Sequence, residues 1–389
     1  MDHPGNPISR RRTLLAGAGL ATAAGLGLTA PAAAATRGGA SPRPVEDPDG
    51  ASKPCLTPQQ MAGQRVIFSY PGTTVPQSLL DLIAAGLAGG VILFGENVSS
   101  LSQITAAVQQ MHEANRSSPA GAPLLVMADQ EGGKVRRLPG GPVLSAKAMG
   151  ESADPAEAAA SAGREAGLLL RGAGVNVNLA PVLGVYRAAG DFLDQYQRSF
   201  SMDPQVVSVC GRSFITAQQE TRVAATAKHF PGLGSATASE NTDLAPVTLT
   251  TSRSELRRVD EFPYEAAIGA GVQLVMLSWA IYTGLDPDRP AGLSRTVIQR
   301  ELRGRHDFRG VTITDAINAG GLAAFGTPAQ NGVLAAEAGM DLILEATRDI
   351  SHGQAVAEAL ADALTGGTLD PRQFDASLHR IVRLRHSLA

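Results

Sequence analysis

The run "LLVMA" at residues 124–128 contains only apolar residues, follows Pro123 and leads directly into the charged Asp129. A run this short and wholly apolar is typical of a strand buried on both faces of a parallel sheet. Similar runs recur along the chain. They cover residues 65–69, 90–94, 175–179, 224–228, 273–277, 311–314 and 341–344. The sequence therefore predicts eight buried parallel strands.

Longer amphipathic segments lie between these runs, as at residues 99–115 and 154–174. In the second of them, an Asp-Pro pair predicts the start of a helix, and two closely spaced glycines predict its end. Residues 370–389 predict a closing amphipathic helix. Strands that alternate with helices indicate a (β/α)8 TIM barrel, here a single domain over residues 56–389. A doubly wound open sheet is the alternative fold.

Residues 1–35 have the composition of an export signal. Arg10, Arg11 and Arg12 precede a weakly hydrophobic segment that ends in small residues, a pattern that resembles a twin-arginine signal. A membrane anchor is the alternative, but the segment is too rich in glycine to favour stable membrane insertion. Residues 36–55, rich in Pro, Gly and Ser, indicate a disordered linker. We therefore expect an exported protein, extracellular or in the cell envelope.

The composition excludes several classes of protein. With a formal net charge of −3 over 389 residues, the chain offers no basic stripe for nucleic acid or an anionic membrane surface. No HExxH motif or Cys/His cluster occurs, so we expect no metal or other cofactor, and no G-x-S-x-G elbow supplies a serine nucleophile.

Cys55 and Cys210 either form a disulfide or remain two separate buried thiols. We expect a monomer.

Charged residues directly follow several of the predicted strands. Asp129 follows the third strand, Lys228 and His229 end the fifth, and Asp315 follows the seventh. In a barrel the carboxyl ends of all strands meet at one rim, where active sites form. A single Asp at such a position is often only a helix N-cap. Several charged residues converging on the same rim favour a binding or catalytic site.

Seven short motifs extend this pattern in a fixed order. They are GGVILFGEN (89–97), ADQEGGKVRRL (128–138), GVNVNLAPVL (174–183), QRSFSMDP (197–204), AKHFPGLG (227–234), LDPDRPAGLS (285–294) and FRGVTITDAI (308–317). Together they resemble glycoside hydrolase family 3, specifically its single-domain β-N-acetylhexosaminidase branch. The resemblance covers essentially all of residues 56–389. It implies a (β/α)8 barrel, in agreement with the strand count, and retaining hydrolysis of a terminal β-linked sugar.

The resemblance also implies roles for individual residues. Asp315, within "TITDAI", matches the nucleophile that forms a glycosyl-enzyme intermediate. The matches to the family's sugar-binding positions are Asp129, Arg137, Arg198, Lys228 and His229. Charged groups suit this task because they form the stronger hydrogen bonds to hydroxyls. A structural ion pair with a neighbouring acidic residue is the alternative role for the two arginines.

The loop after the fifth strand departs from the family pattern. The branch carries an Asp-Ser-His triplet there, in which the His transfers the proton and the Asp orients it. Ser239, Glu240 and Asn241 occupy the matching positions in this chain. One interpretation is that Glu240 or Asp243 acts as the acid/base, with a pKa raised by partial burial.

Two other interpretations of this loop stay open. Either a different carboxylate, such as Asp191 or Asp194, supplies the proton, or the protein binds sugars with little turnover. We predict an exported retaining glycosidase that hydrolyses terminal β-linked N-acetylglucosamine from cell-wall or chitin-type saccharides. The alternatives are a β-glucosidase-like hydrolase of the same family and a sugar-binding pseudoenzyme. The candidate catalytic residues are Asp315, Asp243 and Glu240.

Overall fold

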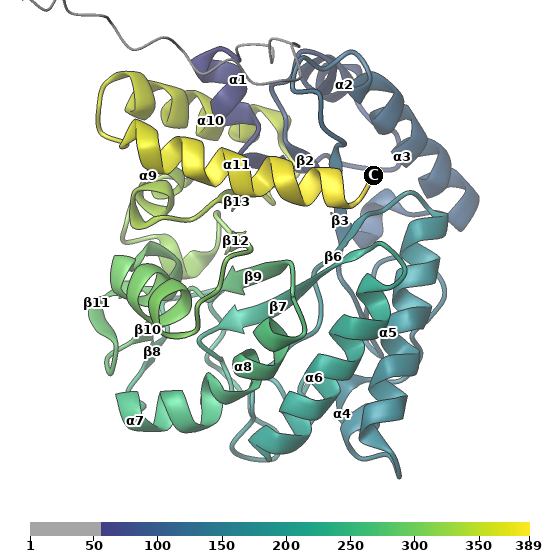
Figure 1. Cartoon of the computed structure of the whole chain (residues 1–389), viewed down its shortest axis with the longest axis vertical. Helices are drawn as coiled ribbons and strands as arrows, with labels where there is room; N and C mark the ends of the chain where they lie inside the picture. The colour runs from purple at the N-terminus through teal and green to yellow at the C-terminus, as the bar shows by residue number, and fades with distance from the viewer. Residues whose placement is uncertain (1–55) are drawn as a thin grey trace, which may run out of the picture. The chain divides into compact units, whose positions relative to one another are not determined.

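In a computed structural model of the chain, which describes residues 56–389, eight parallel strands close into a barrel (Figure 1). Around the barrel their order is β1-β13-β12-β9-β7-β6-β3-β2. They are β1 (Val66–Phe68), β2 (Gly90–Leu93), β3 (Leu125–Ala128), β6 (Val177–Asn178), β7 (Ala224–Phe230), β9 (Leu274–Leu277), β12 (Val311–Ala316) and β13 (Leu342–Leu344). All eight predicted strands are confirmed. Because β1 pairs with both β2 and β13, the barrel is closed and the open sheet is excluded.

Helices surround the barrel and connect its strands (Figure 1). The helices are α1 (Pro58–Gly63), α2 (Gln77–Ala84), α3 (Leu101–Asn115), α4 (Ala146–Gly150), α5 (Pro155–Gly172), α6 (Pro204–Gln219), α7 (Arg253–Glu255), α8 (Phe262–Gly269), α9 (Pro328–Ala338), α10 (Ile350–Thr365) and α11 (Pro371–Ser387). Helical segments of other geometry are the 3-10 helices η1 (Gly95–Asn97), η3 (Ala291–Leu293) and η5 (Gly320–Leu322) and the π-helices η2 (Leu256–Asp260) and η4 (Thr296–Arg305). Helix α5 begins where the sequence predicts, because Asp154 accepts a hydrogen bond from the amide of Glu157.

The predicted export signal (1–35), the linker (36–55) and Cys55 lie outside the described residues. The other cysteine, Cys210, is buried on α6, where its thiol lies 3.4 Å from the carbonyl oxygen of Pro155. Among residues 56–389, no helix combines the length and the hydrophobicity that a membrane crossing requires.

Side chains alternate between the inside and the outside of the barrel, as the two-residue period of a strand requires. On β3, Leu125 and Met127 belong to the interior cluster, whereas Val126 and Ala128 pack against the surrounding helices. Helix α11 contributes Ile381 and Leu384 to the interior cluster, and Leu388, just after the helix, belongs to it as well. This helix therefore covers the end of the barrel at which the strands begin, and Figure 1 shows it in yellow across the front of the barrel.

Five short strands were not predicted from the sequence. They are β4 (Gln130–Gly132), β5 (Val135–Arg136), β8 (Thr248–Leu249), β10 (Ile281–Tyr282) and β11 (Asp286–Pro290). Strands β4 and β5 form a hairpin directly after β3, and the other three form a small sheet. Each is too short to show a hydrophobic period in the sequence. They extend the segments that follow β3, β7 and β9, so they shape the rim at the carboxyl ends of the barrel strands.

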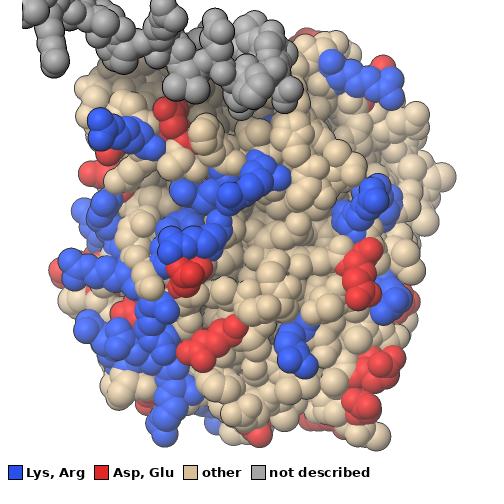
Figure 2. Space-filling view, viewed as in Figure 1, with Lys and Arg blue, Asp and Glu red and all other residues tan. Residues whose placement is uncertain are grey.

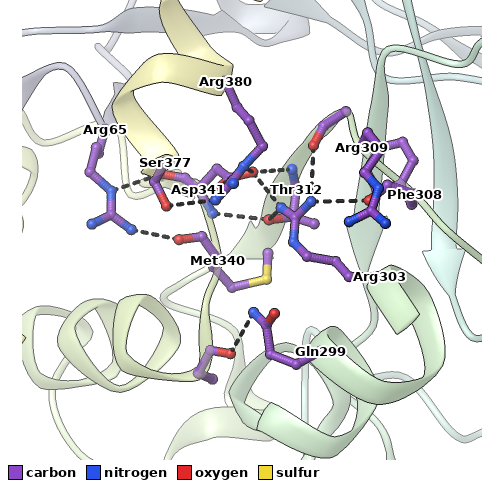
Figure 3. Close-up of polar contacts among 12 residues, drawn as sticks. Arg65, Gln299, Arg303, Phe308, Arg309, Thr312, Met340, Asp341, Ser377 and Arg380 are labelled. Atoms are coloured by element: carbon purple, nitrogen blue, oxygen red, sulfur yellow. Dashed lines mark hydrogen bonds and ion pairs between the residues drawn. The ribbon is translucent and has the colours of Figure 1, made fainter. Parts of the chain in front are cut away.

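A buried charge cluster fixes the opposite end of the barrel, where the strands begin (Figure 3). At its centre is Asp341, a fully buried residue just before β13. Its carboxylate accepts hydrogen bonds from Arg303 at 2.7 Å, from Arg380 at 2.7 Å and from the amide of Thr312 at 2.9 Å. Burial alone would raise the pKa of Asp341, but the two guanidinium groups lower it below its usual value. The cluster therefore joins η4, β12, β13 and α11 through one ionised carboxylate.

The surface over this end of the barrel is mixed in charge. Figure 2 shows the face with α11 in front, where basic and acidic side chains are interspersed with uncharged areas. The formal net charge of −3 agrees with this mixture. The charged residues that the sequence predicts as functional lie at the other end, where the strands finish.

Candidate active site

A pocket of about 320 Å³ opens at the carboxyl ends of the barrel strands. Its floor is apolar and consists of Ile92, Leu179, Met276 and Leu344, the last layer of the barrel interior. The charged and polar residues of its walls are Asp129, Glu131, Arg137, Arg198, Lys228, His229, Asp243, Asp315, Asn318 and Arg348. The pocket therefore brings together every predicted site residue except Glu240, which does not line it.

The strand period explains why three of these residues face the pocket. On β12, Val311 and Ile313 point into the barrel, so Asp315 follows on the same inner side. Asp129 follows Leu125 and Met127 in the same way at the end of β3. Lys228, four residues after the inward-facing Ala224 on β7, lies on the inner side as well. The chain thus places two carboxylates and an ammonium group above the apolar floor.

Lys228 is the centre of an ion-pair network. Its side chain is only 2% exposed, and its Nζ lies 2.6 Å from Asp129 Oδ1 and 2.8 Å from Glu131 Oε1. Burial alone would lower the pKa of Lys228, but the two carboxylates raise it above its usual value. Lys228 is therefore a permanent cation in the wall of the pocket.

Both predicted arginines form ion pairs and also line the pocket. Arg198 donates two hydrogen bonds to Glu131, at 2.9 and 2.7 Å, and Arg137 donates one to Asp129 at 3.3 Å. Burial alone would raise the pKa of Glu131, but Arg198 and Lys228 lower it to about 2. The ion-pair role and the pocket-lining role thus coexist in these arginines.

Glu131 is a site residue that was not predicted from the sequence. It lies on β4, its side chain is 6% exposed, and it pairs with both Arg198 and Lys228. The available signal was its place inside the motif that begins at Asp129, two residues earlier. In an extended backbone, residues two apart lie on the same face, so Glu131 would be expected beside Asp129.

His229 is buried against this network. Burial lowers the pKa of His229 well below its usual value, and the positive charges of Lys228 and Arg198 lower it further. Its Nε2 lies 3.6 Å from Asp315 Oδ2, which is longer than a hydrogen bond. Within residues 56–389, its Nδ1 has no hydrogen-bond partner. At neutral pH His229 is therefore an uncharged imidazole whose Nε2 lies beside Asp315, whereas its unpaired Nδ1 is buried.

Asp315 differs from Asp129 and Glu131 because no lysine or arginine of residues 56–389 is bonded to it. Its Oδ1 accepts a hydrogen bond from the amide of Ala316 at 2.7 Å, and its side chain is 21% exposed. Burial raises the pKa of Asp315 to about 6, and the neighbouring Asp243 carboxylate contributes to the rise. The indole of Trp279 donates to the carbonyl of Ala316 at 2.9 Å and holds this strand end in place. Above about pH 6, Asp315 is thus an ionised carboxylate fixed at the pocket.

The two acid/base candidates of the loop after β7 occupy different places. Asp243 lines the pocket close enough to Asp315 to affect its pKa. Glu240 turns back on its own loop, where its Oε2 accepts a hydrogen bond from the amide of Thr237 at 2.7 Å. Asn241 also serves the loop, because its Oδ1 accepts from the amide of Asp243 at 2.9 Å. Only Asp243 of these acidic residues is placed to meet a bound ligand.

The carboxylates considered as alternative proton donors bind protein groups instead. Asp194 pairs with Lys147 at 2.6 Å and accepts from the amide of Gly190 at 2.7 Å. Asp191 accepts from the amide of Arg187 at 2.8 Å. Neither aspartate lines the pocket. Their geometry favours a role in folding the loop after β6.

Three further wall residues were not among the site residues predicted from the sequence. Arg348, on the loop after β13, pairs with Glu96 at 2.8 Å and lies 4.1 Å from the ring centre of Phe94. Phe94, Asn318 and Arg348 all line the pocket. Asn318 and Arg348 sit in loops without a hydrophobic period, so the sequence carried no signal that would bring them to the site.

Comparisons with known proteins agree with this fold. The glycosyl hydrolase family 3 N-terminal domain matches residues 62–384. An uncharacterised secreted glycosyl hydrolase of Arthroderma benhamiae is 46% identical over 330 residues, which cover 84% of this chain and 93% of that protein.

Two solved structures are also similar. A β-N-acetylhexosaminidase from Beutenbergia cavernae has a TM-score of 0.77 and 32% identity over 86% of this chain and 99% of that chain. A family 3 β-N-acetylglucosaminidase from Paenibacillus sp. str. FPU-7 has a TM-score of 0.80 and 32% identity over 86% of this chain. The chain covers 63% of the Paenibacillus protein, less than two thirds of its length. The chain described here belongs to glycosyl hydrolase family 3.

Proposed function

We propose that this protein is a retaining glycosidase that removes terminal β-linked N-acetylglucosamine, with Asp315 as nucleophile and Asp243 as acid/base. The observation that carries the proposal is the pairing of these two carboxylates in one pocket. Asp315 is fixed at a strand end and bonded to no cation, whereas Asp243 comes from the loop that faces it. Paired carboxylates of this kind are the usual catalytic groups of glycosidases.

In the first step, the ionised Asp315 attacks the anomeric carbon and forms a glycosyl-enzyme ester. Asp243, protonated in this step, gives its proton to the departing glycosidic oxygen, so that the aglycone leaves as a neutral alcohol. In the second step, Asp243 removes a proton from water, and the water oxygen attacks the anomeric carbon. The ester bond breaks, and Asp315 is released as a carboxylate. Two displacements retain the anomeric configuration.

We propose that the ion-pair network binds the hydroxyl groups of the sugar. Lys228 carries three N–H donors, and the contacts to Asp129 and Glu131 use two of them. The third remains for a ligand. Asp129 supplies acceptor oxygens, and the neutral His229 supplies a ring nitrogen beside the nucleophile. Because the network is held by its own ion pairs, it orients the sugar without large rearrangement.

Export of this glycosidase is also a proposal. Its support is the arginine-led segment at residues 1–35, followed by the polar stretch at 36–55. An exported enzyme would meet cell-wall or chitin-type saccharides, which both present terminal β-linked N-acetylglucosamine. The secreted relative from Arthroderma benhamiae supports the same location.

The test is steady-state hydrolysis of an aryl β-N-acetylglucosaminide by the mature protein, beside the Asp315→Asn variant. An aryl group with a low pKa leaves with little acid assistance, so the assay reports mainly on the nucleophile. We expect turnover by the wild type and a loss on the order of 10⁴-fold in Asp315→Asn. Asp307→Asn is the matched control, because Asp307 is exposed and pairs with Arg309.

Three other outcomes would change the proposal. Equal inactivity of wild type and Asp315→Asn on this substrate and on the matching glucoside would favour a sugar-binding pseudoenzyme. Activity on the glucoside alone would favour a β-glucosidase-like hydrolase. Undiminished turnover by Asp315→Asn would remove Asp315 from the role of nucleophile.

A further inference from the structure

We propose that Gly320 and Gly321, on the turn after the nucleophile's strand, are positioning residues that dock the loop after β7 and hold Asp243 at the pocket. This inference rests on the proposed function, because it concerns the placement of the proposed acid/base. The loop after β7 and the turn after β12 contact each other directly.

Two backbone hydrogen bonds join the loops. The amide of Gly320 donates to the carbonyl of Asp243 at 2.9 Å, and the amide of Gly321 donates to the carbonyl of Thr242 at 2.9 Å. Both glycines belong to η5, which begins shortly after Asp315. The proposed nucleophile and the proposed acid/base are therefore attached to the same segment of backbone.

Space, and not backbone conformation, requires glycine at position 320 and leaves little room at position 321. A Cβ on Gly320 would lie 2.3 Å from the carbonyl oxygen of Leu244 and 2.5 Å from its carbonyl carbon. A Cβ on Gly321 would lie 3.0 Å from the carbonyl oxygen of Thr242. Neither glycine has a positive φ. A methyl group at position 320 would have to displace the loop backbone next to Asp243.

The other side of the Asp243 backbone is fixed as well. Its amide donates to Asn241 Oδ1 at 2.9 Å, and the amide of Ala245 donates to the carbonyl of Asn241 at 3.1 Å. Thr242 is only 4% exposed and anchors the segment. Within the described residues, no side chain or amide donates to the Asp243 carboxylate. The backbone of Asp243 is thus held from both sides while its carboxylate stays available in the pocket.

This geometry predicts a selective effect. A displaced loop would move Asp243 and leave Asp315, Lys228 and Asp129 on their strand ends. Loss of general acid assistance affects substrates with poor leaving groups much more than substrates with good ones. A purely structural defect would lower the turnover of both substrates by one common factor. The ratio of the two activities therefore reports the placement of the acid/base.

The experiment measures kcat/KM on an aryl β-N-acetylglucosaminide with a low-pKa leaving group and on the methyl glycoside of the same sugar. The variants are Gly320→Ala, Gly321→Ala, Asp243→Ala and the control Gly269→Ala, whose new Cβ would meet nothing within 4 Å. We expect Gly320→Ala to lower activity on the methyl glycoside by about 10²-fold or more and on the aryl substrate by less than about 10-fold. Gly321→Ala should shift the ratio in the same direction by less.

The inference is overturned if the ratio of the two activities is unchanged in a folded Gly320→Ala protein while Asp243→Ala shows the selective loss. This holds whether both activities fall equally or neither falls. If Gly320→Ala does not fold, the ratio in Gly321→Ala decides in the same way. If Asp243→Ala itself shows no selectivity, the proposed acid/base is wrong, and the docking role falls with it.

Discussion

The two ends of the barrel each carry an aspartate at a strand end, the fully buried Asp341 where the strands begin and the partly buried Asp315 where β12 finishes, and their surroundings are opposite. Asp341 has two guanidinium groups and a backbone amide bonded to its oxygens. Asp315 has one backbone amide, a pocket in front of it and the carboxylate of Asp243 nearby. Accordingly the pKa of Asp341 is lowered, and the pKa of Asp315 is raised to about 6.

With Asp315 as the proposed nucleophile, the comparison separates a structural charge from a reactive one in the same fold. At the closed end, the carboxylate is saturated by protein donors and has nothing left for a ligand. At the open end, the charged groups keep hydrogen-bond donors and acceptors that no other group of residues 56–389 occupies, and these face the pocket. Asp341 is the more buried of the two residues, so burial alone does not indicate function.

The largest effect is expected at Lys228, which belongs to the open end but is as buried as a structural residue. Lys228→Ala would leave Asp129 and Glu131 without their shared cation. We expect a loss of about 3–5 kcal/mol in the free energy of unfolding and a drop in kcat/KM of roughly 10²-fold or more. Urea denaturation and the aryl glycoside assay measure the two quantities. Retained stability in the variant would mean that the ion-pair network is dispensable for folding.

At the closed end, Asp341→Asn should affect stability alone. Removing the charge leaves the partly buried Arg303 and Arg380 without their counter-ion, at an expected cost of about 3–5 kcal/mol. Because the pKa of Asp341 is lowered, the stabilisation is present above its unfolded pKa and is lost as the pH falls through the folded value. The difference between wild type and variant should therefore shrink in acid. A large fall in kcat/KM per folded molecule would contradict the separation of the two ends.

A smaller effect, in pH dependence, links the two carboxylates of the open end. Asp315 must be ionised to attack, so kcat/KM on the aryl substrate should rise with pH through about 6. The charge of Asp243 raises the pKa of Asp315. Asp243→Asn should therefore shift this rise in kcat/KM to lower pH. A rise at the same pH in wild type and variant would show that the two carboxylates do not interact.

Much of this organisation could be predicted from the sequence, and the reasons are local. The eight strands were recognisable because buried parallel strands are short apolar runs. The positions of Asp129, Lys228 and Asp315 followed from the ends of those runs. The cluster around Asp341 was not predicted, because it depends on Arg303 and Arg380, which only the closed barrel brings to it.

The loop after β7 marks the limit of sequence reasoning at the site. Glu240 and Asp243 are both acidic, and nothing in the local sequence distinguishes them. The distinction comes from a contact with Gly320 on a different loop and from the turn that Glu240 makes with Thr237. Neither contact can be inferred from a hydrophobic period or from the spacing of residues along the sequence.

The most direct test of the open end is chemical rescue of Asp243→Ala by azide during hydrolysis of the aryl β-N-acetylglucosaminide. Azide needs no general base to attack a glycosyl-enzyme, so it replaces the function that the variant lacks. We expect azide to raise the turnover of Asp243→Ala and to yield the β-glycosyl azide, while Glu240→Ala behaves as the wild type. Azide without effect on Asp243→Ala, together with rescue of Glu240→Ala, would contradict the assignment of the acid/base and of the pocket's chemistry.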